Sequence, residues 1–179
     1  LANNQFSGSL PGCLFTWLPR LRDLSISNNR LTSSAIPPEI ASAQQLTTLR
    51  ANEAGLSGSL PVELRCARRL ITLTLKGNAL TGSIPQEAIN GLIMLNTLDV
   101  GYNKLTGMIP VFPSSLSELR NLYLNNNVLP TRPQLARPAS RAAPRVPVAR
   151  TLTATWYLEL LWQAFSGEMA KLWPRKWQA

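Results

Sequence analysis

A leucine that returns at a nearly fixed interval constrains the fold of this chain more than any other feature. Each copy opens the same pattern, L-x-x-L-x-L-x-x-N-x-L, most clearly over residues 70–80. A period of about 20–29 residues with this pattern is typical of a solenoid in which each repeat forms one coil. We therefore predict a stack of about five and a half coils over residues 1–129. Intervals of 25, 24, 25 and 24 residues separate the copies, which are Leu21, Leu46, Leu70, Leu95 and Leu119.

The pattern also predicts which side chains point inward. Apolar and polar residues alternate around Leu73, which is typical of a short strand with one buried face. A single coil cannot bury its leucines alone, so stacking must supply the core. We expect an α/β solenoid with a parallel concave β-sheet and short 3-10 or helical convex segments. The residues expected inside the clearest coil are Leu70, Leu73, Leu75, Asn78, Leu80 and Ile84.

The asparagine of the pattern has its own physical reason. The turn after each strand places backbone polar groups inside the coil, where they need partners. An asparagine side chain both donates and accepts hydrogen bonds, so stacked asparagines can form a ladder. Ala54 interrupts this column, and we predict that its coil is the least stable. The expected ladder consists of Asn4, Asn29, Asn78, Asn103 and Asn127.

The second half of each repeat reads Gly-x-Ile/Leu-Pro, as in residues 8–11, 58–61, 82–85 and 107–110. The second coil carries a one-residue insertion and reads Ser-Ser-Ala-Ile-Pro over residues 33–37. Glycine permits the turn, and proline fixes φ. The complete pattern resembles the plant-type leucine-rich repeat of receptor-like kinase ectodomains, receptor-like proteins and polygalacturonase inhibitors. This resemblance covers residues 1–129.

The resemblance implies a protein- or peptide-binding module that belongs to a cell-surface, membrane-associated signalling receptor. Two alternatives stand beside it: an inhibitor of a secreted glycan-degrading enzyme, and a repeat fragment without independent function. Leu1 aligns with Ile26 in mid-repeat, so we expect a piece of a longer product. No signal peptide, paired capping cysteines or N-x-S/T sequon supports the cell-surface location.

The outward positions of the predicted strands form columns along the concave sheet. They bring charged and aromatic residues onto one face, a combination that suits a protein or peptide interface. The simpler interpretation is an ordinary hydrophilic sheet face. Arg65, Arg68 and Arg69 are expected on the outer side of a coil, as a solvated cluster. The candidate ligand-binding residues are Arg50, Lys76, Asp99, Tyr102 and Tyr123.

The sequence gives little support for catalysis. It contains no histidine, which removes the commonest general base and metal ligand. Motifs for phosphate binding or metal-dependent hydrolysis do not occur. Cys13 and Cys66 lie two coils apart, at roughly 10 Å, beyond disulfide range, so we expect free thiols. We therefore expect a protein that is not an enzyme and has no cofactor or metal.

The regular pattern ends after Leu129. Residues 1–129 carry 10 basic and 7 acidic residues, whereas residues 130–179 carry 8 and 2, so the tail supplies +6 of the net +9. Residues 130–150 are rich in proline and arginine and predict a disordered linker. Residues 151–179 are aromatic and basic, and their spacing predicts a helix. Three interpretations remain for that helix: a cap on the solenoid, an unselected tail, or a segment with weak membrane-surface or partner contact. No specific nucleic-acid partner is expected.

Overall fold

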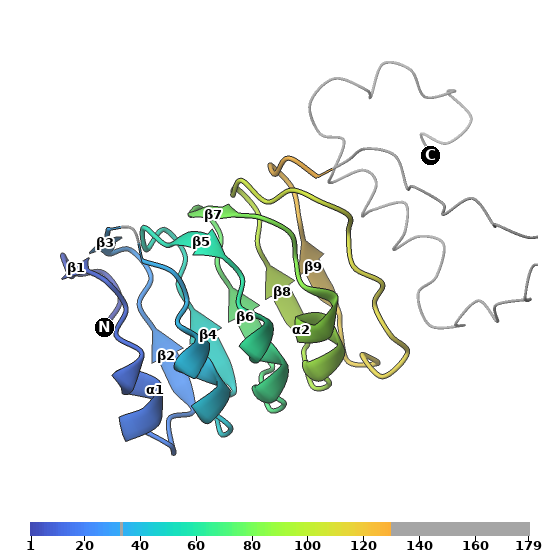
Figure 1. Cartoon of the computed structure of the whole chain (residues 1–179), viewed down its shortest axis with the longest axis horizontal. Helices are drawn as coiled ribbons and strands as arrows, with labels where there is room; N and C mark the ends of the chain where they lie inside the picture. The colour runs from blue at the N-terminus through green and yellow to red at the C-terminus, as the bar shows by residue number, and fades with distance from the viewer. Residues whose placement is uncertain (33, 130–179) are drawn as a thin grey trace, which may run out of the picture.

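The described part of the chain, residues 1–32 and 34–129 of a computed structural model, winds into coils that stack side by side (Figure 1). Each of five coils contributes a three-residue strand to one parallel sheet with the order β2-β4-β6-β8-β9. The predicted parallel sheet is thereby confirmed. The five strands are β2 (Asp23–Ser25), β4 (Thr48–Arg50), β6 (Thr72–Thr74), β8 (Thr97–Asp99) and β9 (Asn121–Tyr123).

Neighbouring strands pair so that the central leucine of each lies beside the central leucine of the next. This register follows from the near-constant period, because a shift of one residue would turn every leucine to the opposite face. The central leucines are at most 8% exposed. They are Leu24, Leu49, Leu73, Leu98 and Leu122.

Short helical segments cover the opposite, convex side of the coils (Figure 1). Pro37, Pro61 and Pro85 each precede one of these segments in an extended conformation. Proline fixes φ and lacks an N–H, so it starts a helical turn without the loss of a hydrogen bond. No helix forms between Pro110 and Leu119. The segments are α1 (Cys13–Trp17), η1 (Pro38–Ser42), η2 (Val62–Cys66) and α2 (Gln86–Gly91).

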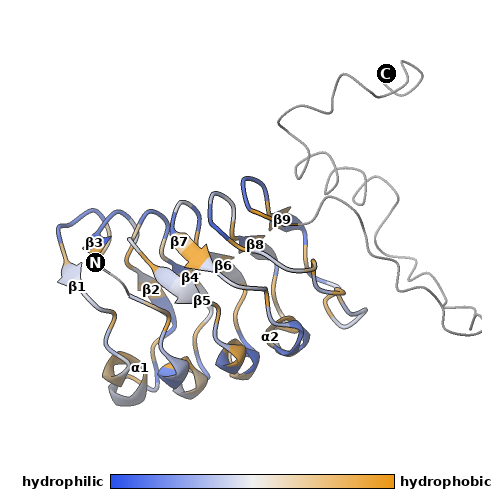
Figure 2. Ribbon diagram, turned by 45° about the horizontal axis from the view of Figure 1, so that its top comes forward, coloured by the Kyte–Doolittle hydropathy of each residue, from blue (hydrophilic) through white to orange (hydrophobic). Residues whose placement is uncertain are grey.

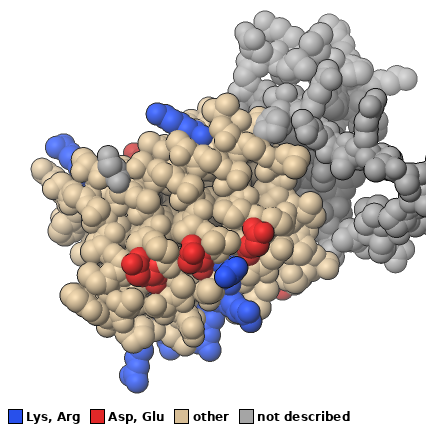
Figure 3. Space-filling model, viewed as in Figure 1, with Lys and Arg blue, Asp and Glu red and all other residues tan. Residues whose placement is uncertain are grey.

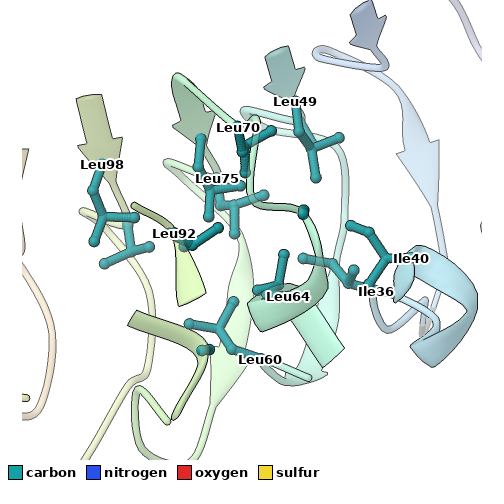
Figure 4. Close-up of a cluster of buried hydrophobic side chains, with 14 of the residues drawn as sticks. Ile36, Ile40, Leu49, Leu60, Leu64, Leu70, Leu75, Leu92 and Leu98 are labelled. Carbon is teal, nitrogen blue, oxygen red and sulfur yellow. The ribbon is translucent and has the colours of Figure 1, made fainter. Parts of the chain in front are cut away.

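One continuous apolar core runs through the stack between the sheet and the helical segments (Figure 4). The leucines and the isoleucine expected inside the clearest coil are all buried, at 4% exposure or less. Each fully buried leucine contributes about 1.5–3 kcal/mol to folding. The turns along one rim of the stack are mostly hydrophilic (Figure 2). The leucines of the apolar pattern therefore lie in the core, and the hydrophilic turns of the rim face solvent.

A second, smaller set of parallel strands follows the asparagine positions. It is divided into two pairs by the insertion in the second coil, where only Ser34 forms an isolated bridge with Leu56. Ser34 is buried, and its hydroxyl accepts a hydrogen bond from the Leu10 N–H at 2.7 Å. The hydroxyl thus satisfies a backbone group beside the interruption. The pairs are β1 (Ser7–Gly8) with β3 (Arg30–Leu31), and β5 (Ser57–Ser59) with β7 (Ala79–Thr81).

Asparagine side chains bridge successive coils beneath these strands. Asn103 shows the pattern: its Oδ1 accepts the Leu80 N–H at 3.0 Å, and its Nδ2 donates to the carbonyls of Leu75 and Val100, both at 3.0 Å. Asn29, Asn78 and Asn127 bridge in the same way. At the N-terminal end, the exposed side chain of Asn4 donates to the carbonyls of Leu1 and Ala2 in its own coil.

At Ala54, where the asparagine column is interrupted, a backbone group takes the place of the missing side chain as hydrogen-bond acceptor. The Leu31 N–H, which an asparagine at position 54 would accept, donates instead to the Ala54 carbonyl at 2.9 Å. On the other side, the Oδ1 of Asn78 accepts two amides, from Ala54 at 3.1 Å and from Leu56 at 3.0 Å. Asn78 therefore accepts one backbone amide more than Asn103 does, namely that of Ala54.

Other sequence predictions have different outcomes. Cys13 and Cys66 are free and half-buried, as expected. Within the described part of the chain, no helix has the length and apolar character needed to cross a membrane. The predicted linker at 130–150 and helix at 151–179 lie outside the described residues, so both remain predictions.

Candidate ligand-binding face

The concave sheet presents its outward residues in straight columns. The register aligns one column across all five strands. In this column Arg50 is exposed, Asp99 is half-buried and Tyr123 is 39% exposed. Thr74 separates Arg50 from Asp99, so the strands that carry these two charges lie roughly 9.6 Å apart. The column runs Ser25, Arg50, Thr74, Asp99 and Tyr123.

The next outward column carries a chain of hydrogen bonds to backbone amides. The Ser27 hydroxyl accepts the Asn52 N–H at 3.1 Å, and the Asn52 Oδ1 accepts the Lys76 N–H at 3.0 Å. A lysine has no acceptor, so the pattern changes in the following coil. There Asp99 Oδ1 accepts the Gly101 N–H of its own coil at 3.0 Å. Asp99 therefore has a structural bond as well as an outward position, a role that the sequence pattern did not indicate.

A third column lies where the chain leaves each strand, and all of its members have positive φ. The values are 54° for Asn28, 50° for Glu53, 70° for Gly77, 55° for Tyr102 and 55° for Asn126. Asparagine and glycine adopt this left-handed conformation readily, whereas other residues do so at a cost of roughly 1 kcal/mol. Glu53 and Tyr102 are therefore held in strained positions. Both are exposed on the surface.

Lys76 and Tyr102 associate across two adjacent coils of this face. The ammonium Nζ of Lys76 lies over the Tyr102 ring, 5.2 Å from its centroid, which is within cation–π range. Tyr102 remains 50% exposed. The lysine thus fixes one side of the aromatic ring and leaves the rest of its surface open.

The electrostatics of Asp99 reflect its position between core and solvent. Burial raises the pKa of this carboxyl, while the Gly101 N–H and the nearby charge of Lys76 lower it. Burial is the largest of the three effects. The ionised carboxylate is therefore less favourable here than in water.

The structure brings some of the candidate residues together and separates others. Lys76 approaches both Tyr102 and Asp99, and Tyr123 pairs with Asp99 across adjacent strands. Arg50 lies apart, beyond Thr74, whose hydroxyl oxygen is buried without a hydrogen-bond partner among the described residues. Glu53 was not among the residues predicted from the sequence. The sequence could have indicated Glu53, because it is a carboxylate at a position where the backbone favours asparagine or glycine.

Residues 1–32 and 34–129 contain no cluster of three histidine, cysteine or acidic side chains that could hold a metal ion. The face offers charged and aromatic groups on a rigid sheet. Such a surface suits recognition of another molecule.

Comparisons with known proteins agree with this architecture. Family models described as leucine-rich repeats match residues 20–43 and 68–129. The ectodomain of the Arabidopsis thaliana receptor kinase SOBIR1 is 30% identical, with a TM-score of 0.64, over 71% of this chain and 67% of that chain. This chain belongs to the plant-type leucine-rich repeat family. No curated protein sequence gives a significant match.

Two longer receptors are also similar to this leucine-rich repeat chain. A TDR receptor is 38% identical and the Arabidopsis receptor kinase HAESA 36%, each with a TM-score of 0.68 over 72% of this chain. The chain spans 22% and 21% of those proteins, respectively. It therefore corresponds to a small part of each receptor's stack of repeats.

Proposed function

We propose that residues 1–129 form a protein- or peptide-binding module of a receptor-like cell-surface protein, with the ligand on the concave sheet. The observation that carries this proposal is the contiguous group of Lys76, Asp99, Tyr102 and Tyr123 on that face. Two similar structures support it by what they contain: HAESA in complex with the peptide hormone IDA and the co-receptor SERK1, and the plant receptor RGFR1 in complex with RGF2.

The dimensions of the sheet suit an extended peptide that crosses the strands. Four intervals of about 4.8 Å give a width of roughly 19 Å, which about six extended residues would span. The two tyrosines supply large contact areas with little loss of side-chain freedom on binding. Tyr102 is further preorganised by Lys76 and by its left-handed backbone. Preorganisation favours affinity because less entropy is lost when the ligand binds.

The proposal is tested with the full chain and a peptide library displayed on phage, followed by affinity measurements on selected synthetic peptides. We expect Tyr102→Ala and Tyr123→Ala each to weaken the affinity about tenfold, as removal of an interface anchor does. Trp17→Ala is the matched control, because Trp17 is 77% exposed on α1, away from the sheet. The proposal is wrong if every peptide that binds is unaffected by both tyrosine substitutions, or if Trp17→Ala weakens binding as much.

A further inference from the structure

Three exposed apolar side chains gather at the edge where the convex segments lead into the strands. Ile71 is 41% exposed, Ile93 is 44% exposed and Met94 is 48% exposed. Ile71 precedes β6, and the other two follow α2 in the next coil. A single exposed apolar residue is ordinary, whereas a contiguous group marks an interaction site.

Backbone hydrogen bonds join the two coils that carry this group. The N–H groups of Asn96 and Thr97 both donate to the Ile71 carbonyl, at 2.9 and 3.1 Å. This pairing sets Ile71 beside Asn96, two residues after Met94 in the chain. At the end of α2, a methyl group in place of the Gly91 hydrogen would overlap the Arg65 backbone. The glycine therefore lets this turn pack directly against the preceding coil.

Arginines flank the apolar group on the side of that preceding coil. Arg68 and Arg69 are exposed and occupy the positions that Ile93 and Met94 hold one coil later. The Arg69 guanidinium donates to the side-chain oxygen of Gln45, which keeps it along the same edge. On the opposite side, Glu118 occupies the position equivalent to Met94 in the last described coil. The charge around the apolar group is therefore asymmetric.

The acidic residues of the convex side lie elsewhere. Glu39, Glu63 and Glu87 each fall in the first turn of a helical segment. Figure 3 shows acidic side chains in a row across these segments, with Lys and Arg side chains gathered below them along the lower edge. The edge is thus more basic than the convex surface above it.

We propose that this basic–apolar edge, formed by Arg65, Arg68, Arg69, Ile71, Ile93 and Met94, docks an acidic segment of a partner protein. Apolar side chains of the partner cover Ile93 and Met94, and its carboxylates meet the arginines. Arginine suits this role because its planar guanidinium binds carboxylates through two parallel hydrogen bonds. Arginine and methionine are also enriched at protein interfaces. The edge is separate from the concave columns, so this docking is additional to the proposed ligand binding.

The test uses the full chain as bait for a phage-displayed peptide library at low salt. Retained peptides are counter-selected against two double variants, Arg68→Glu/Arg69→Glu and Ile93→Ser/Met94→Ser. We expect the peptides that depend on the edge to combine aspartate or glutamate with large apolar residues. A synthetic peptide of this kind should bind each double variant at least about tenfold more weakly, and its binding should also weaken as salt rises. Far-UV circular dichroism checks that the variants fold.

Matched control variants separate docking at the edge from binding elsewhere on the surface. Met108→Ser and Val111→Ser remove apolar side chains of 63% and 75% exposure away from the edge, and should leave the affinity unchanged. Tyr102→Ala should also leave it unchanged, which separates this proposal from the concave face. The proposal is overturned if the selected peptides lack acidic residues or respond to the concave variant. It is equally overturned if phosphatidylserine vesicles, or a second copy of the chain in sedimentation experiments, depend on the edge in place of acidic peptides.

Discussion

Replacement of Asn78 by alanine should destabilise this protein more than replacement of any other asparagine in the ladder. The Asn78 side chain accepts the amides of Ala54 and Leu56 and donates to the carbonyls of Ala51 and Leu75, at 2.7 and 2.8 Å. The Leu75 carbonyl keeps a second donor, Asn103. The substitution therefore leaves three backbone groups without a partner among the described residues.

The magnitude follows from the number of groups left unpaired. Each unsatisfied buried group costs about 1–3 kcal/mol, with values at the lower end here because the site is partly open to solvent. We expect Asn78→Ala to lower the free energy of unfolding by about 3 kcal/mol. Asn103→Ala leaves only the Leu80 N–H, because Asn78 and Asn127 still serve the other carbonyls, and should cost about 1–2 kcal/mol.

Urea unfolding followed by circular dichroism measures these differences, and amide hydrogen exchange locates them. Asn90→Ala on the exposed side of α2 is the control, expected to change stability by less than about 0.5 kcal/mol. The amides of Ala54 and Leu56 should lose protection in the Asn78 variant. The reasoning is refuted if Asn78→Ala costs no more than the control, or if those two amides exchange as slowly as before.

Three other features of the stack have measurable consequences. The coil of Ala54 should exchange its amide hydrogens faster than its neighbours, since it lacks its own side-chain amide; equal protection would contradict this. Tyr102→Asn should raise the urea midpoint of unfolding, which corresponds to roughly 1 kcal/mol of relieved backbone strain. The same substitution should weaken ligand binding. An unchanged or lower midpoint would show that the left-handed tyrosine is unstrained. Because folding raises the pKa of Asp99, its ionisation disfavours the folded state as pH rises above the ordinary value of 3.8. Asp99→Asn should therefore be slightly more stable than the parent near pH 7, with no difference at pH 3. Unfolding curves that keep the same difference at both pH values would refute this assignment.

The coil architecture could be predicted from sequence because every repeat carries the same pattern of leucines. The buried positions of Leu70, Leu75 and Leu80 follow from local alternation and from the period alone. The convex segments were less predictable in detail. The stretch from Pro110 to Leu119 follows the same Gly-x-Ile-Pro signal as the others, yet it forms no helix. Pro113 occupies the position at which Ile40 and Leu64 donate an N–H to the proline that opens the turn, and proline has no N–H to donate.

For the candidate face, the sequence predicted which residues share a column, but not which side chains contact one another. The sequence placed Lys76 and Tyr102 in adjacent columns, but the 5.2 Å approach of the ammonium to the ring depends on how two coils stack. The bond from the Gly101 N–H to Asp99 likewise could not be anticipated, because it replaces an acceptor that Lys76 fails to offer one coil earlier. Side-chain pairs between coils depend on the rotamers of both partners, which a repeat pattern does not encode.

By its sequence alone, this chain determines a period, an inward face and an outward face, since apolar burial and turn chemistry act within each repeat. Only the tertiary structure decides what lies beside what. It pairs the Leu31 N–H with the Ala54 carbonyl, and it sets Ile71 beside Asn96 of the next coil. The physical reason is that hydrogen bonds and contacts between coils join residues 22 to 28 positions apart, through geometry that exists only once the coils have stacked.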